Sequence, residues 1–310
     1  MCEELREYCF TVSEEAEGER IDKYLSQLMD SLSRSYLQRL LGEGNVIVNN
    51  KPVKASCRLK AEDSIRLLLP PKVTPDIDPE NIPLSVLYED SDVIVVNKPK
   101  GMVVHPAAGH YSHTLVNALL FHCGSNLSGI NGILRPGIVH RIDTDTTGSV
   151  IACKNDIAHA SIAGQLKEHR IVRKYRAIVC GSLAQEQGSI HTLIGRHPND
   201  RKKMAVVKSG GKEAVTHYRV LQQFGKYTYV ECELETGRTH QIRVHMAHIG
   251  HPLLGDEVYG KPGVYKGPVP LRGQTLHAKT LGFRQPRTDE YIETDAPLPE
   301  YFQRLLHILK

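Results

Sequence analysis

The amino-acid sequence predicts an α+β protein with a small N-terminal domain and a larger C-terminal domain. Helical periodicity and alternating strand patterns follow one another along the chain, and no internal repeat is present. A proline-rich stretch, residues 70–83, separates a short pattern before it from a longer one after it, and suits an extended linker. At 310 residues the chain is long enough for one large core and a second, small domain.

Two amphipathic helices followed by short strands are expected in residues 18–69. Apolar side chains at helical spacing mark these helices, at Ile21, Tyr24, Leu25 and Leu28 and then at Tyr36, Leu37, Leu40 and Leu41. The second pattern ends at Gly42 and Gly44, which are typical of a helix end. "VIVNNKPV" predicts a strand, an Asn-Asn turn and a strand, and "DSIRLLL" predicts a further strand. We place the boundary of this domain near residue 75.

The remaining chain, residues 82–310, predicts a second α+β domain. Strands are expected in "LSVLYEDSDVIVVNKPKGMVVHP", on both sides of the loop in "IVHRIDTDTTGSVIACKN", in "RKYRAIVCG" and in "VECELET". Helices are expected in "TLVNALLFH", "DIAHASIAGQLKEHRIV" and "THQIRVHMAHIG", and at the C-terminus around Phe302 and Leu305.

Composition narrows the class of protein. Seven cysteines, an odd number without any Cys-x-x-Cys pair, argue against a disulfide framework and against a thiolate zinc knuckle. The N-terminus has no apolar signal-peptide core, and no apolar run has the length of a membrane span. We therefore expect a cytoplasmic protein without a membrane partner. The formal charge of +4 is compatible with an anionic partner but does not require one.

The stretch "HRIDTDTTGS", residues 140–149, concentrates hydrogen-bonding groups between two apolar segments. Asp143 and Asp145 are two residues apart and would face opposite ways in an extended segment, so they do not suit a paired-carboxylate device. Two interpretations remain. A self-satisfied turn is the more common use of such a composition. A reaction centre would need a cation that keeps one aspartate ionised in a partly buried cleft.

Cations that could do so lie in "TGRTHQIRVHMAHIGHPLLGD", at Arg238 and Arg243. The same segment carries His245, His248 and His251 at a spacing of three residues. A zinc pair on a helix usually has a spacing of four with a catalytic Glu beside it, so we expect no metal site here. Hydrogen-bonded or surface histidines account better for this spacing.

Basic residues gather in two separate regions. One is "RHPNDRKKMAVVKSGGK", with Arg196, Arg201, Lys202, Lys203, Lys208 and Lys212, and the other contains Arg34, Arg39, Lys51, Lys54, Arg58 and Lys60. A solvated loop is the usual role of such a run, and contact with a nucleic-acid backbone is the alternative. Two separated clusters favour an extended polyanion. No phosphate-binding loop of P-loop or dinucleotide type is present, which argues against ATP and NAD.

Taken together, the segments resemble the RluA-type pseudouridine synthases. "GIVHRIDTDTTG", "RKYRAIV", "ETGRTHQIRVHMAHIGHPLLGD" and "GQTLHAKTLGF" follow one another in the order and at the spacing of that family. Residues 18–69 resemble an S4 RNA-binding domain, within an expected domain over 18–75, and 82–310 resemble the catalytic domain. The resemblance implies a mixed, mainly antiparallel sheet in the catalytic domain and a small α/β fold in the S4-like domain.

The resemblance also implies roles for individual residues. Asp143 matches the catalytic aspartate of the family, and Ile142 takes the place of the usual leucine, a volume-conserving exchange. Arg141 matches the arginine that helps to extrude the target base. Tyr175 matches the active-site tyrosine that packs on the uracil ring, and Arg243 the basic residue that ion-pairs with the aspartate.

Other polar residues of the loop are expected to have no catalytic role. His140 and Thr147 resemble scaffolding of the loop, and Asp145 is not expected to take part in the chemistry. RNA contacts are expected from basic residues of both regions: Arg34, Arg39, Lys51, Lys54, Arg196, Arg201, Lys202 and Lys203.

The implied activity is isomerisation of uridine in RNA without a cofactor. We expect large-subunit ribosomal RNA as the substrate, with either this RNA or the assembling large ribosomal subunit as the partner. The aspartate could act as nucleophile or as general base, and both routes stay open. Three alternatives remain: a related synthase that modifies transfer RNA, an RNA-binding assembly factor without chemistry, and a metal hydrolase that uses the histidines of 240–251.

Overall fold

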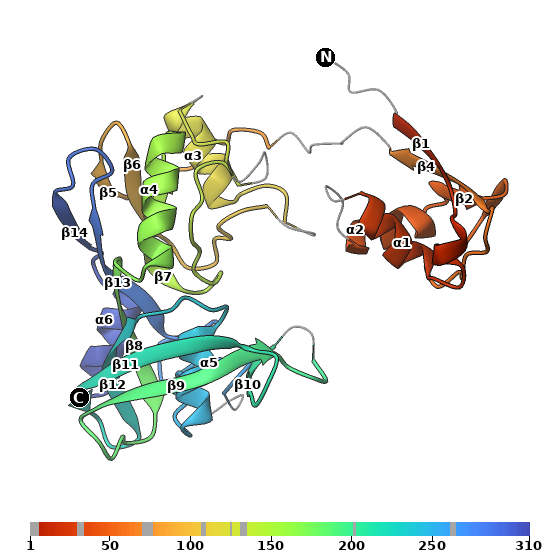
Figure 1. Ribbon diagram of the computed structural model, residues 1–310. Coiled ribbons are helices and arrows are strands. Elements are labelled where there is room, and N and C mark those ends of the chain that lie inside the picture. The colour runs from red at the N-terminus through yellow and green to blue at the C-terminus, as the bar shows by residue number, and fades with distance from the viewer. Residues whose placement is uncertain are drawn as a thin grey trace. The chain divides into compact units, whose positions relative to one another are not determined.

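A computed structural model describes residues 6–29, 34–69, 77–106, 110–124, 126–130, 135–200, 203–260 and 265–310. The chain divides into two compact units, Met1–Pro75 and Asp76–Lys310 (Figure 1). In the part described, no helix is long and apolar enough to cross a membrane.

The N-terminal unit packs two helices, α1 (Ile21–Leu28) and α2 (Arg34–Gly42), on a four-stranded sheet. The strand order is β1-β4-β2-β3. The strands expected from the sequence are β2 (Val46–Val48), β3 (Lys51–Pro52) and β4 (Ser64–Leu69). Strand β1 (Arg6–Thr11) was not predicted, and neither was the 3-10 turn η1 (Glu14–Ala16). β1 pairs antiparallel with β4 and adds an edge to the sheet before the first expected helix.

Local sequence explains this unit well. Ile21, Leu25, Leu37 and Leu40 are fully buried in its core, as the helical spacing predicts. The side chain of Tyr36, from the same predicted stripe, lies outside the described part. The Asn-Asn turn joins β2 to β3 with φ values of 48° and 63°, the conformation that asparagine tolerates in a two-residue hairpin.

A carboxylate is buried among the helices of this unit. Asp22 is 0% exposed and accepts hydrogen bonds from Arg20, Arg34 and Gln38 at 2.6–3.1 Å. Burial alone would raise the pKa of Asp22, but the hydrogen bonds from Gln38 and the two arginines outweigh it and lower the pKa to about 2. The charged carboxylate therefore links α1 to the start of α2.

The second unit is built on a ten-stranded sheet of order β10-β9-β11-β12-β8-β13-β7-β6-β5, with β14 beside β13. One strand pair, β13 with β7, is parallel among the described strands, and the others are antiparallel. The expected mixed, mainly antiparallel sheet is confirmed. Its strands are β5 (Val86–Glu89), β6 (Val93–Lys98), β7 (Thr147–Cys153), β8 (Val172–Cys180), β9 (Gln187–Arg196), β10 (Met204–Val207), β11 (Lys212–Gln223), β12 (Tyr227–Leu234), β13 (Leu276–Arg284) and β14 (Tyr291–Asp295).

Four helices cover the two faces of this sheet. They are α3 (Leu115–Cys123), α4 (Asp156–Lys167), α5 (Gln241–His248) and α6 (Glu300–Ile308). α3 packs against Ile94 and Val96 of β6, whereas α4 packs against Val93 and Val95 of the same strand. Since successive residues of a strand point to opposite faces, α3 and α4 lie on opposite sides of the sheet (Figure 1).

The sequence predicted all four helices and strands β5 to β8 and β12. It did not predict β9, β11, β13 or β14. The basic run 196–212, taken by default as a solvated loop, contains strand β10. The strand expected at 138–140 is wrong, because only an isolated bridge from Ile138 to Ala152 forms there. That segment belongs to the loop that leads into β7.

We predict that Asp22→Asn destabilises the N-terminal unit by about 1–3 kcal/mol at pH 7, because two arginines lose their charged partner. The folded-state pKa of Asp22 is about 2, below the unfolded value, so the stabilisation is present above the unfolded value and is lost as the pH falls through about 2. Urea unfolding of wild type and variant should therefore differ most near neutral pH and converge in acid. The exposed Glu15→Gln is the control, and equal stability of all three proteins at pH 7 would contradict the prediction.

Candidate active site

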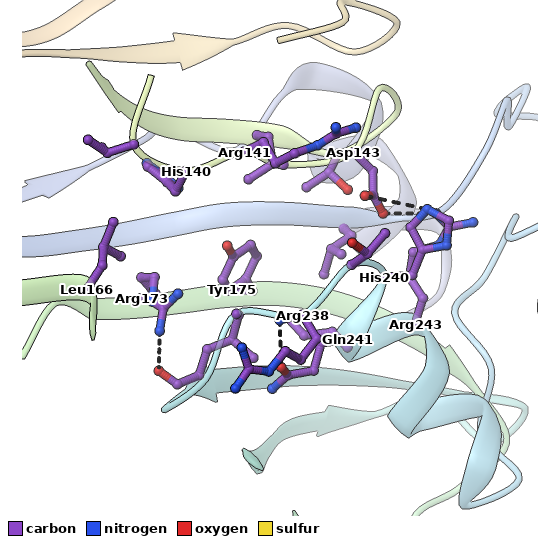
Figure 2. Close-up of a pocket in the computed structure, with 18 of the residues that line it drawn as sticks. His140, Arg141, Asp143, Leu166, Arg173, Tyr175, Arg238, His240, Gln241 and Arg243 are labelled. Carbon is purple, nitrogen blue, oxygen red and sulfur yellow. Dashed lines mark hydrogen bonds and ion pairs between the residues drawn. The ribbon is translucent and has the colours of Figure 1, made fainter. Parts of the chain in front are cut away.

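A pocket of about 570 Å³ opens in the second unit where the loop before β7, strand β8 and helix α5 meet (Figure 2). Its wall includes Arg141, Asp143, Tyr175 and Arg243, the four residues expected at a reaction centre. They come from segments up to 102 residues apart in the chain, from 141 to 243. Ile142, Tyr175, Ile242 and Leu276 belong both to this wall and to the main apolar core, so the pocket rests on rigid packing.

Asp143 and Arg243 form an ion pair in the pocket. Arg243 Nη1 donates to Asp143 Oδ2 at 2.9 Å, and the Asp143 side chain is 19% exposed. Among the described residues that line the pocket, Asp143 is the one carboxylate. Arg243 is thus the cation that a reaction centre would need. The loop before β7 presents one carboxylate, that of Asp143, to the cavity.

Arg243 is itself held by a second carboxylate, Asp256, which sequence reasoning did not single out. Arg243 Nε and Nη2 donate to the two oxygens of Asp256 at 2.7 and 3.0 Å, and the Asp256 side chain is 0% exposed. Asp256 Oδ1 also accepts the backbone N–H groups of Val258 and Tyr259. Burial opposes the charge of Arg243, but Asp256 and Asp143 outweigh it and raise the pKa of Arg243. Arg243 therefore acts as a fixed positive charge and not as an acid.

His240 lies on the other side of Asp143, with Nε2 3.7 Å from Asp143 Oδ1. It precedes α5 in a left-handed backbone conformation, with φ 57° and ψ 19°, which is uncommon for a residue other than glycine. Its Nδ1 is 2.9 Å from the Tyr259 hydroxyl, which accepts the backbone N–H of Met204. Burial lowers the pKa of His240 although Asp143 opposes this, so the ring is neutral near pH 7. One ring nitrogen of His240 thus contacts Tyr259 and the other lies near Asp143.

Tyr175 lies on β8 with 8% of its surface exposed. Burial raises its pKa, Arg173 opposes this and Asp143 adds to it, so the side chain is a neutral phenol near pH 7. Its ring forms part of the apolar wall and its hydroxyl remains a possible donor. Arg141 is exposed, and its Nη1 lies 3.4 Å from His105 Nε2.

The loop that carries Asp143 is fixed from behind by a buried lysine. Lys98 is 1% exposed, and its Nζ donates to the carbonyl oxygens of Pro99, Met102 and Thr144 at 2.8–2.9 Å. Burial lowers the pKa of Lys98 to about 7, against the attraction of Asp145 and Asp143. Sequence reasoning did not identify this lysine, because a Lys after an apolar strand is usually exposed.

The other polar residues of the loop contact the scaffold. His140 Nε2 accepts the backbone N–H of Ile151 at 3.1 Å, and Thr147 Oγ1 lies 2.8 Å from His277 Nδ1. Asp145 does not line the pocket. The loop is therefore both a hydrogen-bonded turn and the support of one carboxylate.

His245 and His251 are hydrogen-bonded to neighbouring strands. His245 lies between the hydroxyls of Thr192 and Thr216, at 2.9 and 2.8 Å, and burial lowers its pKa to about 4. His251 Nδ1 lies 2.9 Å from the carbonyl oxygen of Cys180. No group of three His, Cys, Asp or Glu side chains in the described ranges is placed to hold a metal ion.

The expected RNA-binding residues have different surroundings. Lys51, Lys54 and Arg196 are exposed, and Lys203 is half-buried. Arg34 is paired with Asp22 and its side chain is 48% exposed. Arg201, Lys202 and the side chain of Arg39 lie outside the described residues.

Comparison with known proteins identifies both units. The RNA pseudouridylate synthase family matches residues 92–248, and the S4 domain family matches residues 19–65. An RNA pseudouridine synthase of Bacillus subtilis is 49% identical over 300 residues, which cover 97% of each chain. The ribosomal large subunit pseudouridine synthase D of Zymomonas mobilis is 44% identical over 306 residues, 96% of each chain.

A solved structure agrees with these matches. Human RNA pseudouridylate synthase domain containing 1 aligns with a TM-score of 0.56 and 25% identity, over 74% of this chain and 96% of that chain. The resemblance noted in the sequence is confirmed by these matches. The protein belongs to the RNA pseudouridine synthase family and carries an S4 domain ahead of its synthase domain.

Proposed function

We propose that this RNA pseudouridine synthase acts on uridines of large-subunit ribosomal RNA and that Asp143 is its catalytic carboxylate. The observation that carries the assignment of Asp143 is its position as the one carboxylate on the described pocket wall, paired with the buried Arg243. The ribosomal target is supported by near full-length relatives that are named ribosomal large subunit pseudouridine synthase D.

The reaction needs few protein groups. Uridine becomes pseudouridine when the N1–C1′ bond breaks, the uracil turns and a C5–C1′ bond forms, without oxidation or reduction. A carboxylate can take part as a nucleophile or as a general base, and the geometry of Asp143 suits either route. The guanidinium of Arg243 donates to that carboxylate at 2.9 Å and so fixes its position in the pocket.

The neighbouring residues suit the handling of the base. A target uridine must leave its stack, which costs a few kcal/mol. The exposed Arg141 would fill the vacated place, and the ring of Tyr175 would pack against the uracil. Burial raises the pKa of Tyr175, so its hydroxyl stays protonated near pH 7 and can donate a hydrogen bond to the substrate.

The exposed lysines Lys51 and Lys54 of the S4 domain and Arg196 of β9 would contact phosphates of the RNA. Arg39, Arg201 and Lys202 would extend these contacts. Arg34 would contribute less, because it already pairs with Asp22. We further place the enzyme in the cytoplasm, since each cysteine that the structure describes is a free thiol.

We predict that Asp143→Asn lowers isomerisation by about 10²-fold or more, because the isosteric amide removes the charge. The test incubates purified protein with total RNA from a strain that lacks the gene and maps pseudouridine in all RNA classes. Asp145→Asn is the matched control, two residues away and outside the pocket wall, and should stay within about tenfold of wild type.

Wild-type protein should restore pseudouridine in large-subunit ribosomal RNA. Pseudouridine restored in transfer RNA alone would show that transfer RNA is the substrate. Full activity of Asp143→Asn would show that this residue has no catalytic role.

Removal of residues 1–75 should leave a folded synthase domain that binds RNA more weakly. This segment forms its own compact unit with its own apolar core. Each phosphate contact that is lost should lower the slope of log affinity against log salt by about 0.7–0.9. Filter binding at several salt concentrations measures this slope. An unchanged affinity and slope would show that the S4 domain does not hold this RNA.

A further inference from the structure

The pocket continues along β8 beyond Tyr175 to a second buried side chain, Arg173. Residues two apart on a strand share a face, so the two side chains lie next to each other, about 7 Å apart along the strand. Both line the pocket, and Tyr175 is affected electrostatically by Arg173 as well as by Asp143. Figure 2 shows Tyr175 between Arg173 and Asp143. Arg173 thus lies at the end of the pocket away from the catalytic carboxylate.

Arg173 is buried, and no carboxylate among the described residues forms an ion pair with it. It is 7% exposed, and its Nη2 donates to the backbone carbonyl oxygens of Glu235 at 2.8 Å and Leu234 at 3.5 Å. Its Nε is buried and has no hydrogen-bond partner among the described residues. Burial lowers the pKa of Arg173, and no carboxylate offsets this. A buried charge is normally paired, so Arg173 favours the binding of an anion in the pocket that it lines.

The surroundings of Arg173 are also positive. Lys167 and Arg238 also line the pocket, Arg238 is close enough to lower the pKa of Arg173 further, and Asp143 is the one acidic residue of the described wall. Gly237 lies against the guanidinium, since a Cβ at this position would be 2.6 Å from Arg173 Nη1. The absence of a side chain at 237 therefore leaves room for the guanidinium.

We propose that Arg173 binds a backbone phosphate of the RNA next to the target uridine. This inference rests on the proposed function, because the anion is a phosphate of the bound RNA strand. Arg173 lines the same pocket as Asp143 and lies two residues from Tyr175 on β8, so it is near enough for a phosphate of the strand that carries the target uridine. A guanidinium donates charge-assisted hydrogen bonds to phosphate oxygens, and the Arg173 side chain lines the pocket.

The test compares Arg173→Met with Lys174→Met. Lys174 is the next residue on β8, but it lies on the other face of the strand, beside Glu231 and Glu233. Both changes remove one positive charge. Arg173→Met should lower the salt slope of RNA binding by about 0.7–0.9 and weaken binding about tenfold or more. Lys174→Met should leave the slope unchanged.

The RNA is a ribosomal oligonucleotide that contains a uridine identified by the mapping experiment. Because the contact serves binding, Arg173→Met should lower RNA affinity by a larger factor than it lowers the single-turnover rate at saturating RNA. Equal slopes for wild type and Arg173→Met would overturn the proposal. The salt slope measures binding and does not require turnover. RNA that binds but is never isomerised would therefore count against the proposed function and not against the phosphate contact of Arg173.

A second measurement needs no folded variant. Wild-type protein is bound to oligonucleotides in which a methylphosphonate neutralises the phosphate on the 5′ or the 3′ side of the target uridine. One of the two should bind about tenfold more weakly than unmodified RNA. The folded Arg173→Met variant should bind that oligonucleotide and unmodified RNA with equal affinity. The substitution and the methylphosphonate remove the same contact, so their effects should not add. The proposal would be overturned if wild type bound both modified oligonucleotides as tightly as unmodified RNA. That result is expected if Arg173 only supports the fold.

Discussion

The buried guanidinium of Arg243 is the interaction on which the arrangement of the site depends. It contacts Asp143 on the loop before β7 and Asp256 on the turn after α5, so it joins two segments that are distant in sequence. It also lies over the ring of Tyr259, 5.1 Å from the ring centre. Arg243 carries one positive charge and contacts two carboxylates, so the group of three has a net negative charge. Asp143 is the carboxylate of this group that faces the pocket. Asp256 is fully buried and sets the position of Arg243, which in turn sets that of Asp143.

The sheet supplies the rigid support that this charge arrangement needs. Lys98 at the end of β6 holds the Thr144 carbonyl from behind, and His140 binds the N–H of Ile151 in β7. Directly after the loop, Gly148 has a φ of 107°, and a Cβ there would lie 2.2 Å from the carbonyl oxygen of Ala278. Glycine therefore allows the close parallel contact of β7 with β13, and the loop of Asp143 begins and ends on fixed backbone.

Sequence and structure agree where the signal is local. Helical spacing identified Ile21 and Leu25 as core residues, and the motif HRID identified the loop of Asp143. Asp256 and Arg173 could not be found in this way, because an aspartate after a glycine and an arginine on a strand have many ordinary roles. Their importance depends on partners at Arg243 and Glu235, which only the folded chain brings near. β9 and β11 were missed because many of their residues are half-buried or exposed, which weakens the apolar pattern.

The most direct measurement of the central claim is the single-turnover isomerisation rate of Arg243→Lys. A lysine keeps the charge but cannot donate to both oxygens of Asp256 and to Asp143 from fixed directions. The account predicts that the rate at saturating RNA falls by about 10²-fold or more while RNA affinity stays near that of wild type. A lysine variant with the full rate would contradict it, because charge alone, without the geometry of the guanidinium, would then suffice to position Asp143.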